Sequence, residues 1–591
     1  MPRRSNYDKF PAVAAGPAEE CSVGWQAIAA RLQPHLRERR VLCVECYPGV
    51  LVRAAMKEMS AHLRLPTVFF AEECLKSPEQ LRALLAPLLG TDRVFARMSG
   101  LALEDYLDAS WLSVMRTAVE EAARRGPVLV MGAAASLVAP PQATLVYADL
   151  ARWEIQLRWR RGEIGNLGLN NAEDDLAAKY KCGFFAEWRA ADRLKKTLLP
   201  KIDFLLDSNR PQSPRLISGS AFRAALKQTA QRPFRVVPYF DPGPWGGHWM
   251  EEVCDLPRDA PNHAWCFDCV PEENSLLLGY GEQRVEIPSI DLVFSHPREL
   301  LGDAVHGRFG TEFPIRFDFL DTMGGGNLSL QVHPLTEYIQ DKFGMNYTQD
   351  ESYYLLDAGH GAAVYLGLKD NIAPGEMIGD LYRAQEDGAA FPAEKYVNRW
   401  PARRHDHFLI PAGTIHCSGA ESMVLEISAT PYIFTFKLWD WGRLGLDGKP
   451  RPIHIEHGAA NMQWDRTTQW VLSNLINRFE TVAEGDGWRE ERTGLHEREF
   501  IETRRHWFTG AVPHHARCGV NVLNLVEGEE AIVESPGGAF EPYVVHYAET
   551  FIVPAAVGAY TVRPHGTSEG KECATIKAFV RTGVGDDGSC R

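Results

Sequence analysis

The sequence predicts a multidomain protein: an N-terminal α/β domain with a parallel sheet, then two β-barrel domains with helical insertions. Three observations predict this. Amphipathic helices alternate with short apolar strands over the first third of the chain, a turn-rich segment follows at residues 207–214, and a pattern in the later part occurs twice. A chain of 591 residues is also too long for a single hydrophobic core.

The N-terminal domain, expected over residues 1–210, is predicted from its alternating elements. Apolar runs of strand length are separated by helical patterns, which is typical of a parallel sheet covered on both faces. The expected strands are residues 40–44, 67–70, 127–131, 143–147 and 202–206, and the clearest helices are residues 51–63 and 103–125.

This arrangement resembles the nucleoside and nucleotide kinases of the P-loop class, but the expected phosphate loop is degenerate. The turn Glu45–Val52 keeps Gly49 and lacks the lysine and the Ser or Thr that hold phosphate and magnesium. We therefore expect a kinase-like domain with a regulatory or structural role. A basic cluster near its end either holds an anion or forms a solvated helix face: Arg158, Arg160, Arg161, Arg189, Arg193, Lys195 and Lys196.

Composition and charge exclude several classes of partner. The formal net charge of −14 argues against a nucleic-acid or anionic-membrane surface. No apolar stretch is long enough to cross a bilayer, and the first ten residues lack a secretory apolar run, so we expect a cytoplasmic protein. The pairs Cys43/Cys46 and Cys266/Cys269 are either a four-thiolate zinc site or buried structural thiols. Oligomeric state is left open.

Four polar residues in the middle of the chain form a candidate metal site. Gln331 and His333 alternate on a short strand-like run, so both side chains point to one face. Glu351 opens a second strand-like run, and His416 follows a Pro-Ala-Gly turn. Nitrogen and oxygen donors from separate segments are the pattern of a divalent-metal site.

An internal repeat assigns this site to one barrel only. Residues 408–416 are echoed by residues 551–559, which places Ala559 where the first copy has His416 and Asn521 where it has Glu351. His514 and His515 lie nearby, but neighbours on a strand point to opposite faces. The expected domains are a linker at 211–234, a metal-binding barrel at 235–452, a helical segment at 453–499 and a barrel without metal ligands at 500–591.

An ordered set of motifs then carries a family resemblance. In sequence they are Pro244–Gly247, Ala264–Asp268, Phe313–Asp321, Leu328–Pro334, Glu351–Leu356, Val364–Lys369, Ile410–His416 and Leu425–Glu426. From about residue 235 to 591 the chain resembles the type I phosphomannose isomerase family, a zinc-dependent branch of the cupins. The resemblance implies two cupin barrels, with one Zn²⁺ ion in the first, held by Gln331, His333, Glu351 and His416.

The resemblance also implies a reaction, the interconversion of mannose 6-phosphate and fructose 6-phosphate through an enediol. Around the metal, however, the chain departs from the family. Gln349 and Asp318 stand where the family has lysines, and Lys437 stands where it has its catalytic arginine. We expect catalytic roles for Lys437, Glu426 and Asp440, and substrate binding by Ser329, Arg443 and Lys449.

Two alternatives remain at this point. The first is a metal cupin isomerase that acts on another sugar, which the two lost lysines favour. The second is a non-catalytic sugar-binding regulatory protein that uses the N-terminal domain to signal. In the leading interpretation, the partner is a small sugar phosphate.

Overall fold

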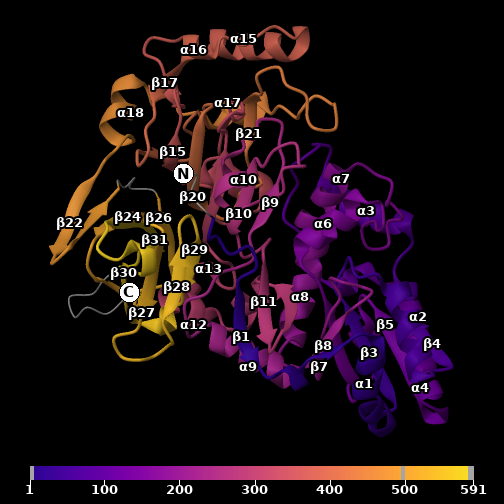
Figure 1. The fold of residues 1–591 in the computed structure, drawn as a ribbon. Helices are drawn as coiled ribbons and strands as arrows, with labels where there is room; N and C mark the ends of the chain where they lie inside the picture. Colours follow the sequence, from indigo (N-terminus) through magenta and orange to yellow (C-terminus); the bar gives the residue numbers. More distant parts are fainter. Residues whose placement is uncertain (1–4, 494–498, 584–591) are drawn as a thin grey trace. The chain divides into compact units, whose positions relative to one another are not determined.

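The computed structural model describes residues 5–493 and 499–583, so the ends of the predicted domains at 1–4, 494–498 and 584–591 lie outside it. The chain divides into two compact units (Figure 1). The α/β unit comprises residues 12–229 and 275–296, and the barrel unit comprises residues 1–11, 230–274 and 297–591. Within the described residues, no helix has the length and apolarity needed to span a membrane.

The α/β unit is built on the predicted sheet. Its seven strands follow the order β2-β8-β7-β6-β3-β5-β4, parallel from β7 to β4 and antiparallel at β8 and β2. Every residue of the central strands β3 and β5 is buried, as expected for a sheet covered on both faces. The bounds are β2 Ser22–Val23, β3 Val41–Cys46, β4 Thr67–Phe70, β5 Val128–Gly132, β6 Thr144–Asp149, β7 Phe204–Asp207 and β8 Arg215–Ser218.

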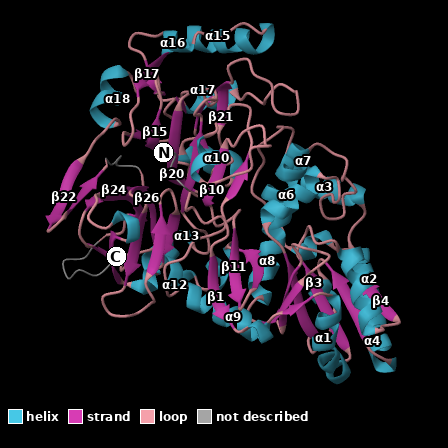
Figure 2. Ribbon diagram, in the orientation of Figure 1, coloured by secondary structure: helices cyan, strands magenta, loops and turns pink. Residues whose placement is uncertain are grey.

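Helices flank the strands of this sheet in the chain (Figure 2). The longest are α1 Trp25–Arg39, α2 Val52–Leu63, α3 Pro78–Leu89, α4 Ala109–Arg125 and α8 Trp188–Leu198. The degenerate loop between β3 and α2 is held from inside the unit, because Arg158 of α6 (Arg152–Arg160) donates to the Gly49 carbonyl at 2.8 Å. Arg158 is buried, so the solvated-face interpretation is wrong for this residue.

The predicted linker at 211–234 differs from the structure. Most of it is folded as β8, which pairs with β7, and α9 (Gly219–Thr229). Leu216, Ile217 and Phe222 are buried, and this apolar content explains why the segment joins the sheet despite its turn-forming start.

A later segment also belongs to the α/β unit. β11 (Ser275–Tyr280) and β12 (Gln283–Pro288) form a three-stranded sheet with β1 (Ala12–Gly16), and α11 (Ile290–Ser295) follows. Asp291 of α11 lies 2.6 Å from the Lys195 amine, which also contacts Asp149 at 2.7 Å. All three are buried, so Lys195 is a structural cation rather than an anion-binding residue.

The first barrel consists of two antiparallel sheets. One follows the order β18-β15-β20-β13-β10-β9 and the other β17-β16-β19-β14-β21. The bounds are β9 Tyr239–Asp241, β10 Trp265–Cys269, β13 Ile315–Asp321, β14 Leu330–Val332, β15 Glu351–Ala358, β16 Ala363–Leu368, β17 Val397–Pro401, β18 His407–Ile410, β19 His416–Ser418, β20 Ser422–Ala429 and β21 Phe436–Trp439. The insertions α14 (Thr336–Phe343), α15 (Pro374–Asp387) and α16 (Ala393–Tyr396) interrupt the strands.

The second barrel repeats this plan with sheets β22-β23-β24-β31-β26-β29 and β25-β30-β27-β28. The bounds are β22 Glu480–Gly485, β23 Trp488–Arg492, β24 Ile501–Phe508, β25 Val512–His515, β26 Asn521–Glu527, β27 Glu530–Glu534, β28 Tyr543–His546, β29 Thr550–Val553, β30 Ala559–Pro564 and β31 Cys573–Val580. The predicted helical segment at 453–499 contains α17 (Ile455–Asn461) and α18 (Thr468–Asn474). Residues 480–492 are instead a hairpin of the second barrel, because β23 pairs with β24.

The two Cys-x-x-Cys pairs lie in different units. Cys43 and Cys46 are in β3 of the α/β unit, and Cys266 and Cys269 are in β10 of the barrel unit. All four are buried free thiols, and no described cluster of three or more metal-ligating side chains includes them. The structure therefore favours structural thiols.

Candidate metal centre

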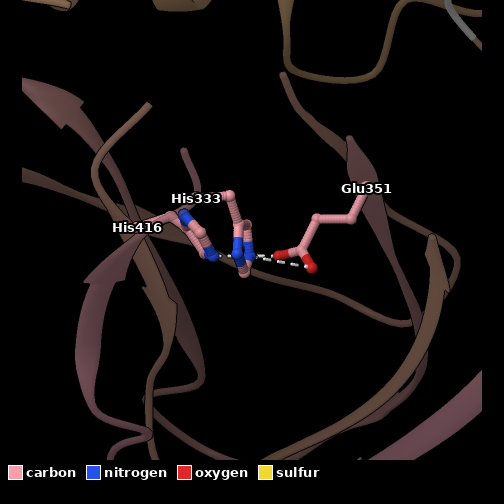
Figure 3. Close-up of side chains that lie close together, drawn as sticks. All are labelled: His333, Glu351 and His416. Atoms are coloured by element: carbon pink, nitrogen blue, oxygen red, sulfur yellow. Dashed lines mark ion pairs between the residues drawn. The ribbon is translucent and has the colours of Figure 1, made fainter. Parts of the chain in front are cut away.

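Three of the four predicted ligands converge between the two sheets of the first barrel. His333 Nε2 lies 3.2 Å from one oxygen of Glu351, and His416 Nε2 lies 2.9 Å from the other (Figure 3). The ligand atoms of the three lie within 4.8 Å of one another, and all three residues are buried. Gln331 is adjacent, with its amide nitrogen 3.3 Å from His416 Nε2.

The hydrogen bonds around the two histidines set their tautomers. His333 Nδ1 lies 3.2 Å from the Phe434 carbonyl, and His416 Nδ1 lies 2.9 Å from the Thr414 carbonyl. A carbonyl only accepts, so each Nδ1 carries a proton in the neutral ring and each Nε2 presents a lone pair to the centre. This is the arrangement that orients a histidine ligand through its second nitrogen.

Lone pairs therefore face each other at the centre. His333 Nε2 and Glu351 Oε1 are buried and have no hydrogen-bond partner among the described residues. Neither a neutral Nε2 lone pair nor a carboxylate can donate, so the cluster is stable only with a proton or a cation between its members. The donor set of two imidazoles, one carboxylate and one amide fits a divalent metal ion.

Strand register explains how the sequence builds this cluster. Gln331 of β14 pairs with His416 of β19 on one side and with Lys437 of β21 on the other. Paired residues on neighbouring strands share a face, so the three side chains form a row. Gly413 turns the chain back before His416 at φ 84°, where an added Cβ would lie 2.8 Å from the Asn461 carbonyl.

Glu351 is ionised in this setting. Burial raises its pKa, but His333 and His416 oppose that effect where their rings are protonated, and the net pKa then lies well below the usual range. Gln349 donates to Glu351 at 2.9 Å and to Glu426 at 3.2 Å. Gln349, at the position where the phosphomannose isomerase family has a lysine, thus places a neutral amide that orients the carboxylate of Glu351.

A buried charge cluster lies behind Glu351. Arg316 of β13 forms an ion pair with Glu426 of β20 and contacts Asp318 at 3.1 Å. Burial, together with the neighbouring carboxylates, raises the pKa of Glu426 well above its ordinary value. Burial also raises the pKa of Asp318 to about 6 despite Arg316. The spacing of these residues in the sequence gives no sign of this cluster, because strand pairing creates it.

Lys437 lies beside Gln331, on the face that carries the cluster. Its side chain is half-buried, and its amine has no hydrogen bond or ion pair among the residues that the structure describes. Burial and the nearby Arg451 lower the pKa of Lys437 to about 7, with Asp440 acting in the opposite direction. Lys437 can therefore exchange a proton near neutral pH.

A polar cluster at the end of β21 gathers most of the predicted substrate residues. Ser329 donates to Asp440 at 2.8 Å, Arg443 contacts the same carboxylate at 2.6 Å, and Arg451 contacts it at 3.0 Å. Asp440 thus serves as counter-ion to both guanidinium groups. Lys449 is exposed in the following loop. Arg451 is a cation of this cluster that the expected substrate-binding residues did not include.

Comparisons with known families and proteins gave two kinds of match. Residues 24–231 match a family described as a domain of unknown function, DUF8485. The chain is similar to mannose-6-phosphate isomerase of Streptococcus mutans, with 26% identity over 36% of this chain and 62% of that protein. It is also 24% identical to mannose-6-phosphate isomerase ManA of Bacillus subtilis, over 38% of this chain and 66% of that protein. The matches thus span less than two thirds of each relative.

Two solved structures that are similar to this chain are also named mannose 6-phosphate isomerase. A mannose 6-phosphate isomerase from Bacillus subtilis aligns with 59% of this chain and 100% of its own, with 18% identity and a TM-score of 0.47. A zinc-bound mannose 6-phosphate isomerase aligns with 59% of this chain and 100% of its own, with 13% identity and a TM-score of 0.44.

Proposed function

We propose that the barrel unit is a zinc-dependent aldose–ketose isomerase that interconverts mannose 6-phosphate and fructose 6-phosphate through an enediol. One observation carries the proposal: the lone pairs of His333, Glu351 and His416 converge in a buried centre, beside the proton-exchanging amine of Lys437. Similarity to proteins named mannose-6-phosphate isomerase supports the choice of substrate.

The ligand residues would be Gln331, His333, Glu351 and His416. Zn²⁺ held there would supply a Lewis acid able to polarise a sugar oxygen without redox chemistry. The protein holds the ligands in place through the Nδ1 hydrogen bonds of both histidines and through Gln349, which donates to Glu351.

Lys437 moves the proton between the two carbons. With a pKa of about 7, a large share of its amines is neutral at physiological pH and can accept a proton from C2 of the aldose. The resulting ammonium returns the proton to C1, and the hydroxyl proton of O2 passes to O1, which completes the conversion to the ketose. A lysine keeps this ability where an arginine, always protonated, stabilises charge instead.

Glu426 acts as a positioning residue in this proposal. Its carboxyl contacts Gln349, Arg316 and Ser428, so it acts on the centre through the amide that orients Glu351. Asp440 plays the corresponding part for the substrate residues, since it fixes Ser329 and Arg443. Phosphate binding falls to Ser329, Arg443 and Arg451, with Lys449 at the rim.

Asp440 also favours a second candidate, an isomerase for an unphosphorylated sugar. Its carboxylate already neutralises Arg443 and Arg451, and it accepts from Ser329, so a phosphate must compete with it for the same donors. An uncharged sugar meets no such competitor.

A coupled assay with mannose 6-phosphate and with mannose, each with and without chelator, tests both candidates. The leading proposal expects turnover of the phosphorylated sugar that chelator abolishes and added Zn²⁺ restores. Turnover of mannose alone selects the second candidate. Stoichiometric bound zinc with sugar binding but no turnover of either sugar would contradict both and favour the sensor alternative.

A further inference from the structure

The second barrel contains a cavity of about 700 Å³ that the proposed reaction does not use. It is lined by charged and polar side chains, among them Lys577, Arg504, Arg517, His514, His515 and Asn521. We propose that this cavity binds a small oxyanion, a carboxylate or a phosphate, at the position that corresponds to the metal centre of the first barrel. The proposal does not depend on isomerase activity.

Strand register establishes the correspondence. In the first barrel, Glu351 of β15 pairs with Ile410 of β18; in the second, Asn521 of β26 pairs with Val553 of β29. On their other edges, Glu351 pairs with Ser428 and Asn521 pairs with Phe579. These strands of the two barrels therefore pair in corresponding registers, as the sequence repeat predicts.

Two residues away along β20 and β31, the first barrel has acidic side chains where the second barrel has basic ones. Glu426 of β20 corresponds to Lys577 of β31, counted from Ser428 and Phe579. The partner of Glu426 on β13 is Asp318, and the partner of Lys577 on β24 is Arg504. An acidic pair behind a candidate cation site has become a basic pair beside a cavity.

The positions that hold the candidate metal ligands in the first barrel also differ in the second barrel. Gln331 pairs with His416 in the first barrel, and His515 pairs with Ala559 in the second. Two residues on, the position of His333 is Arg517. Glu351 is replaced by the uncharged Asn521, so the carboxylate is lost. His515 and Arg517 are exposed, so Arg517 adds its guanidinium to the lining of the cavity rather than to a buried ligand position.

Lys577 and His514 leave donors available. The Lys577 amine lies 3.4 Å from His514 Nδ1, and because an ammonium only donates, Nδ1 accepts and Nε2 carries the ring proton. His514 Nε2 is buried and has no partner among the described residues. A buried N–H without an acceptor costs about 1–3 kcal/mol, which an acceptor oxygen would remove.

The balance of charge favours an anion. Glu490 accepts from Arg504 at 3.0 Å and from His506 at 3.1 Å, and lies 3.4 Å from Lys577. Glu502 also accepts from Arg504. Within the described residues, Arg517 has no ion pair, so its charge adds to a set in which the other cations are matched. The volume suits a small metabolite rather than a polymer.

Isothermal titration calorimetry on the full chain tests the proposal, with inorganic phosphate and malonate as separate probes for the two sources of oxyanion. The variants are Lys577→Met and Arg517→Gln, the second at an exposed side chain that folding does not require. Matched controls are Lys571→Met, at an exposed lysine near the same strand, and Arg451→Gln, which removes a cation of the first barrel.

We expect binding of at least one probe, weakened about tenfold or more by Lys577→Met and by Arg517→Gln. Lys571→Met and Arg451→Gln should change the affinity of this site less than about twofold. The probe that binds more tightly shows whether the cavity prefers a phosphate or a carboxylate. Absence of binding by both probes, or binding that survives Arg517→Gln and Lys577→Met but is lost in Arg451→Gln, would overturn the proposal.

Discussion

At the scale of single residues, the centre is defined by acceptor atoms that face one another. Glu351 and the Nε2 atoms of His333 and His416 present only lone pairs to one another. A carboxylate in such a place needs either a proton or a cation. We therefore propose that Glu351 serves metal binding rather than stability. Its neutral isostere, glutamine, separates these two roles.

Glu351→Gln should remove the metal while the fold remains. The amide keeps the volume of the side chain but loses its charge, so we expect metal content to fall from about one ion per chain to near zero and turnover to fall more than about 100-fold. Metal analysis and circular dichroism measure the two effects. Glu386→Gln, at an exposed carboxylate, should change neither. Full metal content in Glu351→Gln would refute the ligand assignment.

Lys437 predicts the pH dependence of the reaction. Its neutral amine is the base, and the neutral fraction grows as pH rises through the pKa of about 7, so kcat should fall about tenfold per pH unit below 7 and level off above it. In Lys437→Met the remaining activity should be low and should lack this limb. A retained limb with apparent pKa 7 in the variant would exclude Lys437 as its origin.

Residue types and spacing were enough to nominate the four candidate ligands, three of which converge in the structure, because alternation on a strand and a Pro-Ala-Gly turn are local patterns. Gln349, Arg316 and Asp318 could not be placed in this way. Arg316 and Glu426 are separated by more than 100 residues and meet only through the pairing of β13 with β20. Likewise, the role of Asp440 as counter-ion depends on where the loop carries Arg443 and Arg451.

At the scale of elements, α8 is fixed by a buried ion triad. Lys195 lies between Asp149 at the end of β6 and Asp291 of α11, and thereby ties the later segment 275–296 to the sheet of the α/β unit. Burial and the neighbouring Asp149 raise the pKa of Asp291, and Lys195 opposes this rise. The basic pattern of α8 in the sequence gave no sign of this role, because both acidic partners are distant in the chain.

Lys195→Met should destabilise the α/β unit by about 3–5 kcal/mol, since it leaves two buried carboxylates without their cation. Urea denaturation followed by tryptophan fluorescence measures the change. Lys196→Met, at the exposed neighbour, is the matched control and should cost less than about 0.5 kcal/mol. Adding Asp291→Asn to Lys195→Met should recover part of the loss, and equal effects of Lys195→Met and Lys196→Met would contradict the triad.

At the scale of the whole molecule, the two compact units should respond differently to metal. The proposed ligands all lie in the barrel unit, so an ion that binds only the folded state stabilises that unit alone. At a free concentration about 100 times its Kd, the stabilisation is about 2.7 kcal/mol.

Differential scanning calorimetry of the chelated protein should therefore show one transition that rises on adding Zn²⁺ and one that does not move. The Glu351→Gln variant serves as the control, since neither of its transitions should respond. A single transition that shifts as a whole would show that the units unfold together, and no shift at all would argue against zinc binding in the folded chain.

The sequence by itself determined the α/β layer, the repeated barrel and the four ligand candidates, because hydrophobic periodicity and local turns are encoded over a few residues. Only the tertiary structure decided what joins those elements. It folded the predicted linker into β8 and α9, assigned residues 275–296 to the α/β unit and turned residues 480–492 into barrel strands. Strand register, which brings distant residues into contact, also decided the charge around each centre: acidic behind Glu351 and basic beside Asn521.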